Sequence, residues 1–324
     1  MADMRRALKV IHFASQLCGI SQYGSFLRND GYEKPVVCRK YLFYSFILII
    51  AISVGQIRFV FGLMKDNSSE NSDAHRVSKQ IELILVTCIF TTYLVSTISR
   101  LIGMRSFFKI SRKLLSVSSF VNYREGTNFS NAVIVLHVLS FVTYLIRYSV
   151  EWLRSYRRLY LLHFVLSALV CETVTSFAAV QFLYLVFTLR RHFMLLNSSF
   201  NEVVMSTVKL ESILSLKSRT VSDVLPERYS VISSVRDIRY HHLMLCDILG
   251  LINFSYSVEV LVLIGSKFVY ATISLYLLFF SMFDLSVFPD RSFYPLLPLV
   301  SFEVMQLVTL VYCCKSSCFQ VSII

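Results

Sequence analysis

Proline is scarce in this sequence, with five residues among 324. Only Pro295 and Pro298 fall within a long apolar run, so most of these runs carry no proline. Small-solute transporters are expected to show inverted repeats and helices broken by glycine or proline. A transporter is therefore the least favoured class of membrane protein for this chain.

Catalytic motifs are also missing. The sequence has no Walker loop, no dinucleotide-binding fingerprint and no nucleophile elbow. His241 and His242 are adjacent, hence about 100° apart on a helix, whereas helical zinc motifs space their ligands four residues apart. We predict a protein that is not an enzyme, with no catalytic residues, no metal and no cofactor.

Six long apolar runs dominate the sequence instead. The mean hydropathy is +0.62, and 55% of the residues are hydrophobic. Each run can cross a hydrocarbon core that needs roughly 20 residues, and a bilayer forces such runs to be helical. We predict an all-α, polytopic membrane helix bundle with about six transmembrane helices. The runs are Tyr41–Met64, Ile81–Gly103, Ser130–Val150, Leu159–Leu189, Val258–Phe283 and Phe293–Cys314.

Lysine and arginine collect on every second connection between the runs. Twenty-one lie on the N-terminal segment, its same-side connections and the tail, against seven on the opposite connections. The positive-inside rule therefore places the N-terminus in the cytoplasm. Membrane insertion accounts for the net charge of +12 without a nucleic-acid partner. Asn67, in an Asn-Ser-Ser glycosylation sequon of the first connection, agrees with a lumenal position for that connection.

This topology divides the chain into five expected regions. They are a cytoplasmic N-terminal segment 1–40, transmembrane helices in 41–189, a cytoplasmic helical hairpin 190–246, transmembrane helices in 247–314 and a short cytoplasmic tail 315–324. In the hairpin, apolar residues from Phe193 onward recur at helical spacing, which indicates that the fourth helix continues beyond the membrane. A serine-rich break at Ser215–Asp223, followed by Pro226, predicts a loop, and a second helix is expected from Val231.

Charged residues inside spans commonly mark functional sites in membrane proteins. Arg58 and Arg147 lie near the outer ends of their spans and can reach the interface. Glu172 is more central, and both a functional role and simple pairing between helices remain open for it. Glu259 and Lys267 are too far apart on one helix to pair, so each needs a partner on another helix. Glu303 is the remaining charged residue considered within the predicted spans.

The aromatic content, 27 phenylalanines and 18 tyrosines against one tryptophan, is concentrated partly within the spans. Aromatic side chains pack against lipid and each other, but together they can also line an apolar pocket with a few polar groups. Such pockets suit small organic ligands. We predict a ligand site formed by Tyr93, Tyr144, Phe177 and Glu172.

The entry to the fifth span carries the pattern Arg239-Tyr240-His241-His242-Leu243-Met244-Leu245-Cys246-Asp247, followed by Ile252-Asn253-Phe254-Ser255-Tyr256-Ser257. This pattern resembles the insect gustatory receptor family, whose members often show a His-x-x-Leu-Cys-like run, an Ile-Asn pair and a Tyr/Phe-Ser/Gly pair at this place. The matching residues are His242, Leu245, Cys246, Asn253, Tyr256 and Ser257. The size of the chain and its predicted cytoplasmic N-terminus also fit this family.

The resemblance implies a taste receptor of the plasma membrane, on the dendrite of a sensory neuron. It would bind a small-molecule tastant and gate a cation conductance as a homo- or hetero-oligomer in contact with membrane lipid. The family's seventh span, with a Thr-Tyr followed by Gln-Phe, is missing after Cys314. We therefore expect a truncated chain in which channel activity is doubtful and ligand binding is less affected.

A G-protein-coupled receptor is the main alternative. It predicts an extracellular N-terminus, an Asp-Arg-Tyr-type triplet after the third span and an Asn-Pro pair in the last span. The charge distribution contradicts the first of these, and the sequence lacks the other two.

Overall fold

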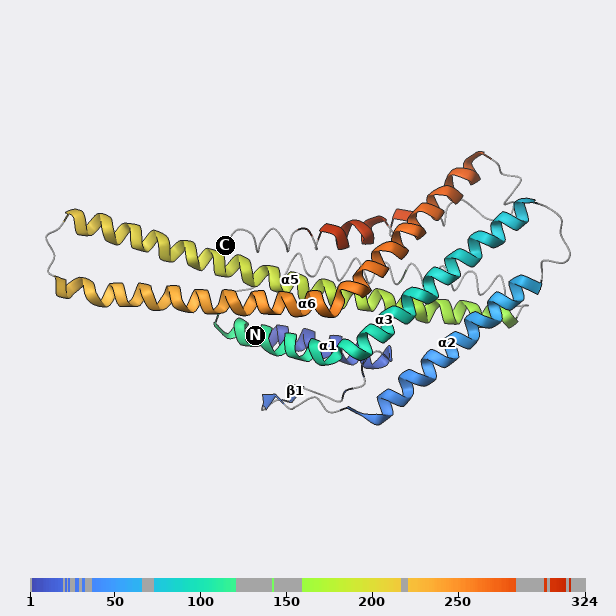
Figure 1. The fold of residues 1–324 in the computed structure, drawn as a ribbon, viewed down its shortest axis with the longest axis horizontal. Coiled ribbons are helices and arrows are strands. Elements are labelled where there is room, and N and C mark those ends of the chain that lie inside the picture. The colour runs from blue at the N-terminus through green and yellow to red at the C-terminus, as the bar shows by residue number, and fades with distance from the viewer. Residues whose placement is uncertain are drawn as a thin grey trace.

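The computed structural model describes residues 2–19, 21, 23, 27–28, 31–32, 37–65, 73–120, 142, 159–216, 221–283, 300–301, 304–312 and 315. These residues are almost entirely helical, which confirms the predicted all-α class (Figure 1). The helices are α1 (Ala2–Leu17), α2 (Arg39–Lys65), α3 (Asp73–Phe120), α5 (Leu159–Leu216) and α6 (Val221–Phe283). A minimal antiparallel hairpin pairs β1 (Leu27–Arg28) with β2 (Gly31–Tyr32) between α1 and α2.

Four of the described helices, α2, α3, α5 and α6, are long and apolar enough to cross a membrane. Each contains one of the predicted spans, and α2 matches its predicted span to within two residues at either end. The predicted span Ser130–Val150 lies outside the described residues except for Val142. The predicted span Phe293–Cys314 is helical at 300–301 and 304–312, the parts that the structure describes.

Helix α3 is longer than its predicted span. The apolar run ends at Gly103, but the helix continues for 17 more residues, to Phe120. The reason is that Phe107, Ile110 and Leu114 continue the helical spacing and are all buried, so packing maintains the helix after the mean hydropathy falls.

Helices α5 and α6 lie side by side in an antiparallel hairpin (Figure 1). The expected continuation of the fourth span is present, because α5 runs unbroken to Leu216. The predicted start of the second helix at Val231 is wrong, since α6 begins at Val221. Pro226 is the sixth residue of α6, so the helix continues through this proline.

Helix α6 changes direction along its length: it follows α5 over its first part and then runs obliquely past α3 (Figure 1). The larger buried cluster joins α3, α5 and α6, with contributions from α1, and is represented by Phe107, Leu183 and Ile252. A smaller cluster brings α2 against α3, α5 and α6 around Tyr93 and Tyr270. The membrane-length helices thus meet where α6 crosses the others.

Gly19 ends α1 in the left-handed region, with φ of +69°, and its backbone N–H donates to Gln16 O over 3.1 Å. A Cβ at this position would lie 3.0 Å from Leu48 Cδ2 of α2. We expect Gly19→Ala to destabilise the fold by about 1–2 kcal/mol, because backbone strain adds to this contact. Thermal unfolding of the purified protein in detergent measures the change.

Gly250→Ala is the matched control for this prediction. Gly250 lies within α6, and a Cβ there meets nothing within 4 Å. Alanine is the better helix former by up to about 1 kcal/mol, so this change should leave the unfolding temperature unchanged or raise it. Similar losses for both variants would contradict the assigned role of Gly19.

Candidate functional site

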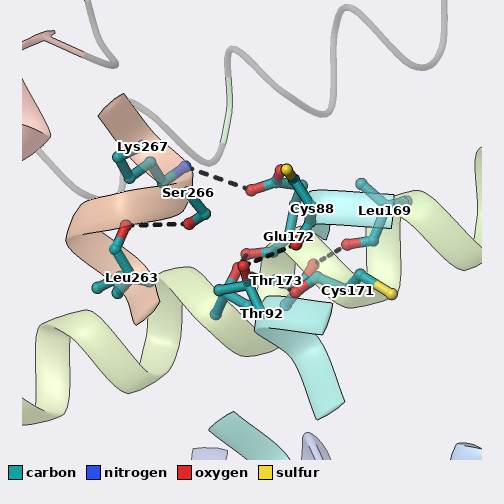
Figure 2. A network of polar contacts seen from close by, with 10 residues as sticks. Cys88, Thr92, Leu169, Cys171, Glu172, Thr173, Leu263, Ser266 and Lys267 are labelled. Atoms are coloured by element: carbon teal, nitrogen blue, oxygen red, sulfur yellow. Dashed lines mark hydrogen bonds and ion pairs between the residues drawn. The ribbon is translucent and has the colours of Figure 1, made fainter. Parts of the chain in front are cut away.

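A buried pair of opposite charges links α5 to α6. Lys267 Nζ lies 3.5 Å from Glu172 Oε2, and the two side chains are 6% and 5% exposed (Figure 2). Glu172 Oε2 accepts no hydrogen bond from the described residues. The ion pair is therefore loose, and the carboxylate oxygen keeps the capacity to accept a hydrogen bond.

A small cavity opens beside this pair at the junction of α3, α5 and α6. The cavity volume is ≈ 10 Å³, which is about the room that one water molecule needs. The lining mixes apolar side chains with hydroxyl and charged groups. It consists of Ile89 and Thr92 of α3, Glu172 and Thr175 of α5, and Ser266, Lys267 and Tyr270 of α6.

A second buried ion pair links α3 to α6. Arg100 Nε donates to Glu259 Oε1 over 3.0 Å, and Arg100 Nη2 donates to Glu259 Oε2, which makes the pair bidentate. The guanidinium also lies over the ring of Tyr256, 3.8 Å from its centroid, in a cation–π contact. All three side chains are buried.

Helix α6 thus carries a buried acid and a buried base that bind different neighbours. Glu259 pairs with α3 and Lys267 pairs with α5, as their spacing on one helix requires. The two pairs leave no net charge among these four side chains. Since removing charges from water is costly, such pairs are retained for geometry more than for stability, and here they define how α6 sits against its neighbours.

Arg100 is a site residue that sequence reasoning missed. It lies within the predicted second span, close to its end, where an arginine is readily interpreted as interfacial. The available signal was Glu259, a carboxylate at the start of the predicted fifth span that needs a cation on another helix. In contrast, Arg58 is exposed on the outside of α2.

The residues of the predicted ligand site are placed as follows. Tyr93 is fully buried in the smaller cluster, beside Cys171 and Tyr270, one residue from the cavity-lining Thr92. Phe177 is half-buried and packs against both clusters, one and a half turns beyond Glu172 on α5. Tyr144 lies outside the described residues, as does the sequon residue Asn67.

The family-motif residues divide between the inside and the outside of α6. Leu245 and Tyr256 are buried, and Tyr256 is the residue that Arg100 covers. Cys246 Sγ lies 3.8 Å from His242 Nδ1, one turn away on the same helix. Asn253 and Ser257 are exposed. The buried motif residues contribute to packing between the described helices, as do the partly buried Cys246 and His242, whose ring meets that of Phe193 of α5 edge-on.

No cluster of three or more metal-ligating side chains occurs within the part of the chain that the structure describes. His242 lies close to Cys246, but neither it nor His241 belongs to a group of three such side chains there.

Comparisons with known proteins place the chain in a family. A comparison with curated protein sequences found no match. Among solved structures, the chain is similar to the insect olfactory receptor OR5 from Machilis hrabei, with a TM-score of 0.61 and 12% sequence identity. The similarity covers 99% of this chain and 80% of the other, and shows a shared fold. The family model described as 7tm Chemosensory receptor matches residues 8–322. The chain is therefore a multi-pass membrane protein that belongs to the 7tm chemosensory receptor family.

Proposed function

We propose that this protein is a chemoreceptor of the plasma membrane that binds a small organic molecule where α3, α5 and α6 meet. The observation that carries this proposal is the cavity beside the loose Glu172–Lys267 pair. Glu172 Oε2 is paired with Lys267 over 3.5 Å but accepts no hydrogen bond from the described residues, so it retains the capacity to accept one from a ligand. Tyr93 and Phe177, which pack near the cavity, are proposed to contribute the apolar part of the site. The sequence also proposes Tyr144, which lies outside the described residues.

Binding is coupled to movement in this proposal, because the cavity is small. Sites for drug-sized ligands typically have about 300–1,000 Å³, whereas this cavity holds about one water molecule. An organic ligand can therefore enter only if α6 shifts relative to α3 or α5. Such a shift changes the geometry of both buried ion pairs and selects a second conformation of the bundle.

The second conformation is proposed to open a cation conductance in a homo- or hetero-oligomer of related receptors. The gustatory motif at His242–Ser257 supports a tastant as the ligand, and we propose taste as the modality. The solved structure that the chain resembles is an olfactory receptor, so the motif alone supports taste over smell.

The test is whole-cell recording from cells that express the chain, alone and together with a related receptor. Sucrose, caffeine and bicarbonate serve as representative sugar, bitter and carbon dioxide-related stimuli. We expect an inward current for at least one stimulus, abolished when external sodium is replaced by N-methylglucamine. Protein that reaches the surface in both settings and never supports a stimulus-dependent current would count against the proposal.

A further inference from the structure

Three of the four hydroxyl groups in the cavity lining, those of Thr92, Thr175 and Ser266, already donate their protons to backbone carbonyl oxygens; the fourth belongs to Tyr270. Thr92 Oγ1 donates to Cys88 O over 2.7 Å, and Ser266 Oγ donates to Leu263 O over 3.0 Å (Figure 2). Thr175 Oγ1 likewise donates to Cys171 O over 3.0 Å. A hydroxyl group has one proton and two lone pairs, so these three oxygens can offer only acceptor capacity to the cavity.

The carboxylate adds to this acceptor character. Glu172 is 4% exposed, lines the cavity, and its Oε2 accepts no hydrogen bond from the described residues. Thr92, Thr175, Ser266 and Glu172 together make a wall that attracts hydrogen-bond donors. The lining also contains one charged hydrogen-bond donor, the ammonium group of Lys267.

The charge balance limits which donors fit. Glu172 and Lys267 already neutralise one another, and so do Arg100 and Glu259. A cationic ligand would leave a net charge in a water-poor environment, which is strongly unfavourable. A neutral hydroxyl group adds no charge, donates its proton to the acceptor wall and accepts a hydrogen bond from an ammonium.

We propose that the cavity is a subsite for a neutral hydroxyl group, so that the receptor selects uncharged alcohols over their ethers and amines. This inference rests on the proposed function and names the ligand class of that site. The hydroxyl group occupies the space of one water molecule, to one side of the Glu172–Lys267 pair and within hydrogen-bond reach of both side chains. The body of the ligand lies among the neighbouring apolar side chains, such as Ile89.

Three probes of matched shape test the selectivity: cyclohexanol, methoxycyclohexane and cyclohexylamine, which is cationic at pH 7.5. The full chain is purified in detergent, and each probe is titrated while the thermal unfolding temperature is measured. We expect saturable stabilisation by cyclohexanol, and at least tenfold weaker apparent affinity for the ether and the amine.

Thr92→Val removes one acceptor of the wall while keeping the side-chain shape. We expect it to weaken the apparent affinity for cyclohexanol about fivefold to tenfold, the effect of one hydrogen bond. Thr173→Val is the matched control, because Thr173 makes the same bond to its own helix, to Leu169 O over 2.7 Å, and does not line the cavity. It should leave the affinity unchanged.

Equal binding of the alcohol and the ether, preferred binding of the amine, absence of binding by all three, or equal effects of Thr92→Val and Thr173→Val would each overturn the inference. Recording currents with the same probes separates it from the proposed function. Selective binding without any current refutes the receptor-channel proposal alone. Equal currents for alcohol and ether retain that proposal and refute the hydroxyl subsite.

Discussion

Replacing Arg100 with alanine is expected to destabilise the folded protein by about 3–5 kcal/mol, the largest effect of any single substitution at the helix junction. The change leaves the Glu259 carboxylate, 3% exposed, with neither of its two guanidinium hydrogen bonds. It also removes the cation above the buried ring of Tyr256. Thermal or denaturant unfolding of the purified protein in detergent measures the loss.

The double variant Arg100→Met with Glu259→Leu separates an uncompensated charge from lost packing. Apolar residues of similar volume can replace a buried ion pair at little cost or with a gain, so most of the lost stability should return. Arg58→Ala, on the exposed side of α2, is the control and should change stability by less than about 0.5 kcal/mol. If the double variant were as unstable as Arg100→Ala, the ion pair would not be the cause.

Lys267→Met is expected to have the second-largest effect, about 3 kcal/mol, because it leaves the buried Glu172 carboxylate without its cation. The effect should be smaller than that of Arg100→Ala because the Glu172–Lys267 pair is held at 3.5 Å and is not bidentate. The unfolding temperature in detergent is again the measurement.

Adding Glu172→Gln to Lys267→Met should recover at least half of this loss, because a neutral amide is far cheaper to bury than an ionised carboxylate. Lys40→Met, at the exposed start of α2, controls for the loss of one lysine charge and should be nearly neutral. A failure of Glu172→Gln to restore any stability would mean that Lys267 acts through packing of its aliphatic stem instead.

The sequence predicts the helices well and their ends poorly. Apolar runs long enough for a bilayer must be helical, which is why the runs beginning at Tyr41 and Leu159 were found. The helix ends were missed because hydropathy indicates which residues lie in the membrane, whereas a helix can continue beyond the membrane. The extension of α3 beyond Gly103 comes from packing between helices. Helix α6 also begins earlier than predicted, at Val221.

The sequence predicted most of the charged residues of the candidate site but not which of them form ion pairs. Glu172, Glu259 and Lys267 stand out in the sequence because charges are rare in spans. Which acid meets which base depends on the crossing of α6 over α3 and α5, and no local pattern encodes that crossing. Arg100 was therefore missed, and Tyr256, noted only as a motif residue, gained its contact with Arg100 from the fold.

Helix α5 has a mechanical consequence for any receptor built this way. Its 58 residues make a rod about 87 Å long, and no glycine or proline interrupts it between Glu172 and Leu216. A tilt of about 5° pivoting at Glu172 displaces the far end, 44 residues away, by about 6 Å. A tilt of α5 that began beside the polar cavity would thus produce a several-fold larger displacement at the tip of the α5–α6 hairpin.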